Sequence, residues 1–213
     1  MQQTVAPSIS ARKVGLLALL AASDGPIVGI TRLQKLLFLM WKRLDRVSPD
    51  RKLTLDFDFH PERYGPADFG VYSDLDFLAA MGHIARTNGA PTPEELISGD
   101  GNGESPTVEE ATENEAAFDY LMRDEEDLVG LAAAERNEQA FQITEHGRRL
   151  LERLAASESE TQSHLVEAIR TAASETLRLY GHWPLSRLLR FVYSEYPEMT
   201  TASEIRERVL PTY

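Results

Sequence analysis

The clearest hydrophobic pattern in the chain is helical and lies between residues 30 and 44. Apolar side chains recur there at every third or fourth position, at Ile30, Leu33, Leu37, Met40, Trp41 and Leu44. This spacing places them along one face of an α-helix. The opposite face carries polar and basic residues, namely Thr31, Arg32, Gln34, Lys35, Lys42 and Arg43. The pattern therefore predicts an amphipathic helix with an apolar inner face and a basic outer face.

Two further helices and a strand are predicted in the first half of the chain. One helix covers about residues 11–22 and ends before Asp24-Gly25-Pro26, because proline cannot continue a helix. The other covers about residues 67–81, and Gly82 is suited to end it. Between these helices lies a half-buried strand over 53–59, where apolar Leu53, Leu55, Phe57 and Phe59 alternate with polar Thr54, Asp56 and Asp58.

The second half is predicted to return to the sheet and then to become helical. Short strands over 83–85 and 140–143 flank an insertion at about 87–138, and Thr144 caps a helix that runs through Leu154. Two shorter helices, over 184–195 and 201–210, are expected after a long one, with Thr201 and Glu204 capping the last. The long helix is marked by the apolar stripe Leu165, Ile169, Ala173, Leu177 and Tyr180.

The order of these elements predicts the fold class. Helix 30–44, helix 67–81, strand, insertion, strand and helix 144–154 follow one another as in a winged helix-turn-helix. We therefore expect a mainly α protein with a winged helix-turn-helix core, a small β-wing and a C-terminal helical extension. The expected organisation is a disordered tail over 1–10, a winged-helix domain over 11–156 with its wing insertion at about 87–138, and the extension over 157–213.

Charge is concentrated in the predicted insertion. The whole chain has a formal net charge of −12. Residues 93–138 contain 2 basic and 15 acidic residues, whereas residues 1–92 contain 11 basic and 9 acidic ones. Because phosphate contacts supply most of the affinity for nucleic acid, an acidic wing disfavours DNA as the target. The acidic segment instead suits a basic partner.

Composition limits the chemistry and the compartment. The 213 residues include no cysteine, which excludes disulfides, thiolate nucleophiles and cysteine-based zinc sites. No apolar run approaches the roughly 20 residues that span a bilayer, and Met1 to Ser10 do not resemble a signal peptide. We expect a cytoplasmic protein that does not contact a membrane.

Three segments resemble a known family. The run Arg32-Leu-Gln-Lys-Leu-Leu-Phe38 is similar to a helix of the SocA-like, Panacea-type antitoxin domains and their uncharacterised winged-helix relatives. The pair formed by Tyr64-Gly-Pro66 and Val71-Tyr72 resembles a second segment of the same group, and the run from Leu188 to Pro197 resembles its C-terminal part. The resemblance implies a compact helical domain that neutralises a toxin or serves as an adaptor by direct protein contact.

Two groups of residues are candidates for contact with a macromolecule. The first is the basic face of helix 30–44, formed by Arg32, Lys35, Lys42 and Arg43, which is either a binding surface or an ordinary solvated helix face. The second is the recognition-helix region, represented by Tyr64, Asp68, Phe69, Ser73 and Asp74. Helix 67–81 has no Arg or Lys to approach a phosphate or a guanine edge, and its carboxylates would face a polyanion.

The sequence offers no catalytic, metal or cofactor site. The five histidines do not stand at the spacing of a metal-binding helix, and no glycine-rich phosphate loop follows a strand. We therefore expect a non-catalytic binding protein of antitoxin or adaptor type, acting on a partner protein such as a toxin or another basic protein. The alternative is a transcriptional regulator of winged-helix type that binds double-stranded DNA and dimerises through its C-terminal helices.

Overall fold

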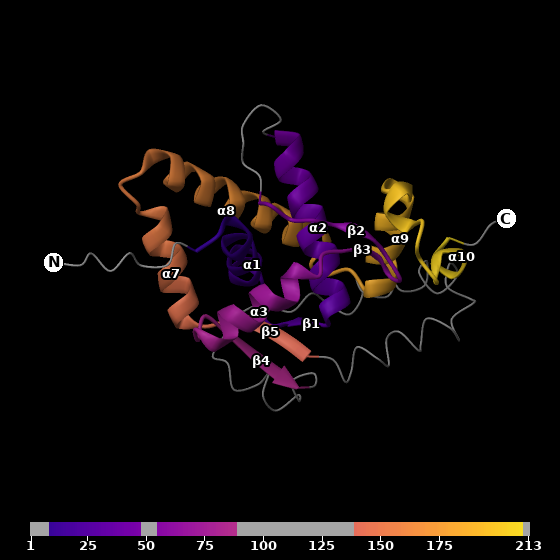
Figure 1. The fold of residues 1–213 in the computed structure, drawn as a ribbon, viewed down its shortest axis with the longest axis horizontal. Coiled ribbons are helices and arrows are strands. Elements are labelled where there is room, and N and C mark those ends of the chain that lie inside the picture. Colours follow the sequence, from indigo (N-terminus) through magenta and orange to yellow (C-terminus); the bar gives the residue numbers. More distant parts are fainter. Residues whose placement is uncertain (1–8, 48–54, 89–138, 211–213) are drawn as a thin grey trace, which may run out of the picture.

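The computed structural model of the protein describes residues 9–47, 55–88 and 139–210, and most of these residues are helical (Figure 1). The helices before the second gap are α1 (Ala11–Ala22), α2 (Ile30–Val47) and α3 (Gly70–Ala80). Those after it are α7 (Glu145–Ala155), α8 (Glu160–Tyr180), α9 (Leu185–Glu195) and α10 (Arg206–Val209), with the 3-10 turn η1 (Pro197–Thr200) before α10. The expectation of a mainly α protein is confirmed.

Two small antiparallel sheets join the helices. The first contains β1 (Ile27–Val28), β4 (Ile84–Asn88) and β5 (Gln139–Ile143), in the order β1-β5-β4. The second is a hairpin of β2 (His60–Glu62) and β3 (Gly65–Ala67). Figure 1 shows the first sheet at one edge of the molecule, with α3 beside it. The strands expected over 83–85 and 140–143 are confirmed as β4 and β5.

Helix α2 lies at the centre of the hydrophobic core. Every residue from Leu33 to Met40 is buried, so the helix is covered on more than the one face that its apolar stripe predicts. Helices α8 and α9 and the strand β3 all pack on it, and Ile169, Ala173, Leu188 and Leu189 of α8 and α9 join the same hydrophobic cluster. Helix α8 also packs along α1 (Figure 1). Side chains from both sides of residue 157 therefore form one core.

The segment 55–59 does not form a strand. The alternation was predicted correctly, since Leu55, Phe57 and Phe59 are buried and Asp56 and Asp58 are exposed. No neighbouring strand pairs with this segment in the described part of the chain, however, and Asp56 has a φ of 48°. The side chains of Arg12 and Asp68 bind its backbone instead. Leu53 and Thr54 of the predicted strand lie outside the described residues.

Helix boundaries follow local chemistry at most ends. Thr144 caps α7 as predicted, its Oγ1 accepting from the Gly147 amide, and Gly82 ends the α3 region with a φ of 71°. Helix α3 begins at Gly70 instead of 67, because residues 65–67 pair with β2. The expected cap of the last helix is wrong: no side chain caps α10, and Glu204 donates its amide to the Arg63 carbonyl.

Parts of the expected domain plan lie outside the described residues. They are residues 1–8 of the expected tail and residues 89–138 of the expected acidic insertion. Ser10 directly precedes α1, and residues 87 and 88 belong to β4.

Substitution of Gly65 tests how closely the β2–β3 hairpin approaches α9. Its φ is 79°, and an added Cβ would lie 2.7 Å from the Tyr193 ring. We expect Gly65→Ala to combine backbone strain with this clash and to lower the free energy of unfolding by more than about 2 kcal/mol in urea titrations. Gly82→Ala should cost only the strain, about 1 kcal/mol, since its φ is 71° and no heavy atom lies within 4 Å. Gly25→Ala, which meets no heavy atom within 4 Å, should be neutral; equal effects of all three would contradict the packing.

Candidate functional site

Helix α3 carries large apolar side chains at exposed positions as well as on its buried face. Its inner face buries Val71, Leu75 and Leu78 against the core. The outward face and its two ends expose the large apolar side chains of the described residues, Phe69 at 63%, Tyr72 at 46%, Phe77 at 40% and Met81 at 50%. We call these four residues the α3 surface. Exposed apolar side chains grouped on one helix face mark a site of interaction more often than scattered ones do.

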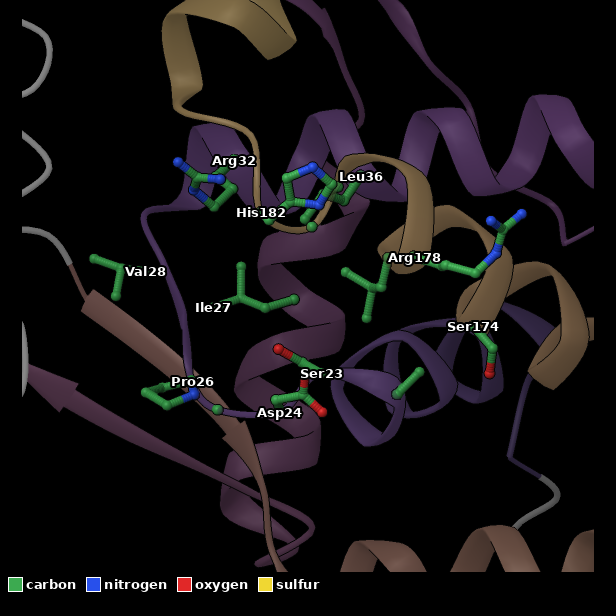
Figure 2. A pocket seen from close by; sticks show the side chains of 14 residues that line it. Ser23, Asp24, Pro26, Ile27, Val28, Arg32, Leu36, Ser174, Arg178 and His182 are labelled. Carbon is green, nitrogen blue, oxygen red and sulfur yellow. The ribbon is translucent and has the colours of Figure 1, made fainter. Parts of the chain in front are cut away.

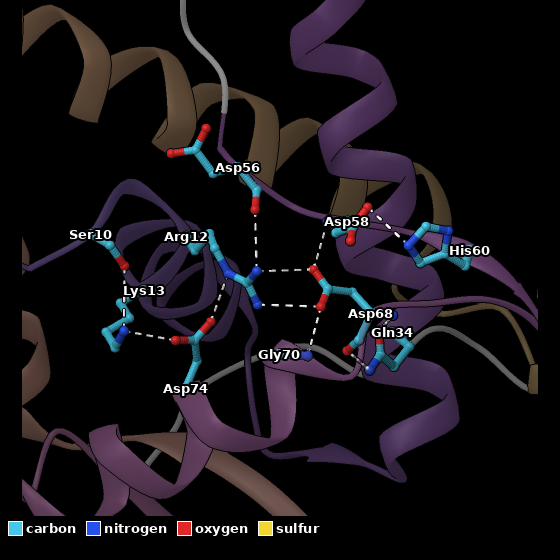
Figure 3. Close-up of polar contacts among 10 residues, drawn as sticks. All are labelled: Ser10, Arg12, Lys13, Gln34, Asp56, Asp58, His60, Asp68, Gly70 and Asp74. Atoms are coloured by element: carbon cyan, nitrogen blue, oxygen red, sulfur yellow. Dashed lines mark hydrogen bonds and ion pairs between the residues drawn. The ribbon is translucent and has the colours of Figure 1, made fainter.

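A buried ion-pair network fixes the orientation of α3 (Figure 3). Arg12 of α1 places its Nε 2.9 Å from Asp74 Oδ2 and its Nη1 3.3 Å from Asp68 Oδ2. Lys13 lies on the other side of Asp74, with 2.7 Å between Nζ and Oδ1. Both carboxylates are almost fully buried, at 2% exposure for Asp68 and 7% for Asp74. Their charge is therefore balanced inside the protein.

Asp68 also organises the backbone around it. Its carboxylate accepts hydrogen bonds from the amide of Gly70 at 2.7 Å and from the amide of Asp58 at 2.8 Å. Its own amide and carbonyl bind the side-chain amide of Gln34 in α2, at 3.1 and 2.9 Å. The Arg12 Nη1 donates to the Asp56 carbonyl at 3.2 Å, which anchors the segment 55–59. Through its carboxylate and its backbone together, Asp68 thus joins α2, α3 and this segment.

The expectation that Asp68 and Asp74 face a partner is therefore wrong. Local helix geometry placed them outward, but the guanidinium of Arg12, which is distant in sequence, draws them inward. Phe69 and Ser73 are exposed as expected. Tyr64 is half-buried in the β2–β3 turn and packs against the core, so it does not extend the α3 surface.

Little net charge is left on the outward side of α3. Its one exposed carboxylate is that of Asp76, whose Oδ1 lies 2.7 Å from Arg86 Nη1 in β4. The ammonium of Lys13 lies 5.1 Å from the centre of the Phe77 ring while it binds Asp74. The α3 surface is apolar and close to neutral, and it lacks the cations that contact with phosphate requires.

A small pocket adjoins the α3 surface. It has a volume of about 230 Å³ and lies between α3, the start of α2 and the strands β4 and β5. Its lining residues are Ile30, Tyr72, Leu75, Asp76, Arg86, Gln139 and Phe141. A pocket of this size accepts one large apolar side chain, and such anchors provide much of the binding energy at protein interfaces.

The predicted basic face of α2 does not form a free cationic surface. Arg32 Nη1 donates to the Trp183 carbonyl at 2.7 Å, and Arg43 pairs with Glu175 of α8. Lys42 lies over the rings of neighbouring aromatic residues, at 4.9 Å from the Trp41 ring centre. Each of these cations is half-buried and engaged within the fold.

Lys35 differs most clearly from the prediction that the basic face of α2 is exposed. It is 1% exposed, and its Nζ donates to the Pro66 carbonyl in β3 at 3.0 Å. Burial lowers the pKa of Lys35 from 10.5 to about 7. Lys35 therefore connects α2 to the β2–β3 hairpin and cannot contact a macromolecule.

Two histidines lie in contact with each other outside the α3 surface. His83 stacks on His146 at 4.6 Å between ring centres, and burial, assisted by His146 and Arg153, lowers the pKa of His83. No group of three or more His, Asp or Glu side chains that could hold a metal ion occurs among the described residues. Within the same residues, no helix combines the length and apolar character of a membrane span.

Comparison with known protein families and with curated proteins found no match for this chain.

Sequence reasoning found part of the α3 surface. It named Phe69 as part of the recognition-helix region. It missed Tyr72 and Met81. The sequence did contain a signal for this surface, since the 11-residue helix α3 has large apolar residues on both of its sides. One apolar face is enough to pack a helix against the core, so the apolar residues on the other side stay exposed.

The buried ammonium of Lys35 predicts a specific pH dependence of stability. Between pH 7 and about pH 9.5 the unfolded chain keeps this proton and the folded protein releases it, so the free energy of unfolding rises with pH, by up to about 1.4 kcal/mol per pH unit. In Lys35→Met this rise should disappear, whereas Lys42→Met should retain it. Urea titrations across this range provide the measurement, and parallel curves for the wild type and Lys35→Met would show that Lys35 keeps its ordinary pKa in the fold.

Proposed function

We propose that this protein is a non-catalytic binding protein of the winged-helix type that docks on a partner protein through the α3 surface. The observation that carries the proposal is the group of four exposed apolar side chains, Phe69, Tyr72, Phe77 and Met81, one of which, Tyr72, lines the small pocket. The role is that of an antitoxin or adaptor, which acts by occupying its partner and not by chemistry.

The arrangement of the elements supports the winged-helix part of the proposal. Helices α2 and α3 are followed by β4, by the segment that leads to β5, and then by α7, which is the order expected of a winged helix. In such a fold α3 stands where a recognition helix stands, at the surface and next to the sheet. Here that helix presents rings and a thioether instead of cations.

The chemistry of the surface supports a protein as the target. Aromatic residues and methionine are enriched at the centres of protein interfaces, where charged residues are depleted. The α3 surface follows this composition, and its single exposed carboxylate is already paired with Arg86. A DNA-reading helix needs arginine or lysine at the same positions. The acidic character of residues 93–138 favours a partner that is basic elsewhere on its surface.

The test compares two double variants in one binding assay. The α3 variant combines Phe69→Ser with Phe77→Ser and removes two of the exposed rings. The α8 variant combines His164→Ser with Thr171→Ser and places serine at two exposed positions of α8. Protein captured from nuclease-treated host lysate by the wild type is purified, and its affinity for each variant is measured. We expect at least tenfold weaker binding to the α3 variant, about 1.4 kcal/mol, and unchanged binding to the α8 variant.

Unchanged thermal unfolding of both variants provides the control for folding. Random-sequence duplex DNA at low salt provides the opposing measurement. Tight duplex binding that weakens steeply with salt, together with full partner binding by the α3 variant, would contradict the proposal and favour the DNA-binding alternative.

A further inference from the structure

A second and larger cavity lies beside β1, and it is distinct from the pocket next to α3. Its volume is about 770 Å³, and it is enclosed by the end of α1, by β1, by the start of α2 and by the C-terminal part of α8. Figure 2 shows side chains from these four elements around one space. The volume falls within the range of about 300–1,000 Å³ that is typical of small-molecule sites.

The floor of this cavity is apolar. Ile27 of β1, Leu36 of α2 and Leu177 of α8 line it, and Ile27 and Leu36 also belong to the buried core. Because these side chains come from three separate elements that pack on one another, the floor is preformed by the fold. Such a surface accepts the hydrocarbon or aromatic part of a ligand.

The rim of the cavity is cationic. Arg32, His182 and Arg178 line it, and in Figure 2 His182 lies between the two arginines. Arg32 is held in place by its hydrogen bond to the Trp183 carbonyl. In the described part of the chain the guanidinium of Arg178 has no carboxylate partner. The single carboxylate among the lining residues is that of Asp24.

We propose that this cavity binds a small organic anion with an apolar body, such as a carboxylate or sulfonate attached to an alkyl or aromatic group. The apolar body lies on Ile27, Leu36 and Leu177, and the anionic group meets Arg178 at the rim. A guanidinium remains charged at every physiological pH and binds carboxylates and sulfonates through paired hydrogen bonds. The hydroxyls of Ser23 and Ser174, which also line the cavity, can donate further bonds to the anion.

This site is independent of the α3 surface, since the two cavities share no lining residue. It can therefore be tested in the Phe69→Ser, Phe77→Ser background, in which an apolar probe has less to bind on α3. The probe is 8-anilinonaphthalene-1-sulfonate, an anionic amphiphile whose fluorescence rises on transfer to an apolar site. Octanoate, with octanol as the uncharged comparison, serves as the competitor.

Arg178→Gln removes the rim cation, and Ser174→Phe fills part of the cavity from an exposed position. Arg170→Gln removes an exposed cation of the same helix outside the lining and is the matched control. We expect saturable binding with one probe per chain. The affinity for the probe should be at least fivefold weaker in Arg178→Gln and in Ser174→Phe and unchanged in Arg170→Gln. Octanoate should displace the probe more effectively than octanol does. Equal affinity in all three variants, equal displacement by octanol, or no saturable binding would overturn the proposal.

Discussion

The structure depends on the ion pairs between Arg12 of α1 and the carboxylates of Asp68 and Asp74. Two buried carboxylates beside each other would repel, and leaving one without a cation is strongly destabilising. Arg12 contacts both, and Asp68 in turn binds the backbone amides of Asp58 and Gly70. One side chain therefore sets the position of α3 against α1 and holds the segment 55–59 in place. As a consequence, these two carboxylates are buried, while the rings of Phe69, Tyr72 and Phe77 are exposed.

Much of the fold could be predicted from local patterns. The spacing of apolar residues located the helices, and turn and cap residues such as Thr144 and Gly82 located several of their ends. The pattern failed where the outcome depends on distant segments. The helical period places Lys35 on the polar side of α2. However, β3 covers that side, and the Pro66 carbonyl accepts a hydrogen bond from the Lys35 Nζ. The segment 55–59 alternates as a strand does, but side chains and not a neighbouring strand bind its backbone.

The candidate site shows the same limit. Phe69 was recognised because its position at the start of the helix alone turns it outward. Asp68 and Asp74 were assigned to the same surface because nothing in their neighbourhood of the sequence reveals Arg12, which lies more than 50 residues away. These two carboxylates therefore no longer count against DNA as the target. DNA is disfavoured instead because the outward side of α3 carries no cation and because Arg32, Lys42 and Arg43 are engaged within the fold. The two cavities remain separate, although Ile27 of the larger one and Phe141 of the smaller one are paired residues of the first sheet.

The most direct measurement is a double-mutant cycle between Arg12 and Asp74, with amide hydrogen exchange of α3 as a second readout. Arg12→Met, Asp74→Asn and the double variant are compared with the wild type in urea titrations. The account predicts a coupling free energy of about 1–3 kcal/mol and faster exchange of the α3 amides in Arg12→Met than in the double variant. Additive effects, with α3 equally protected in all four proteins, would show that these carboxylates do not hold the helix and would contradict the account.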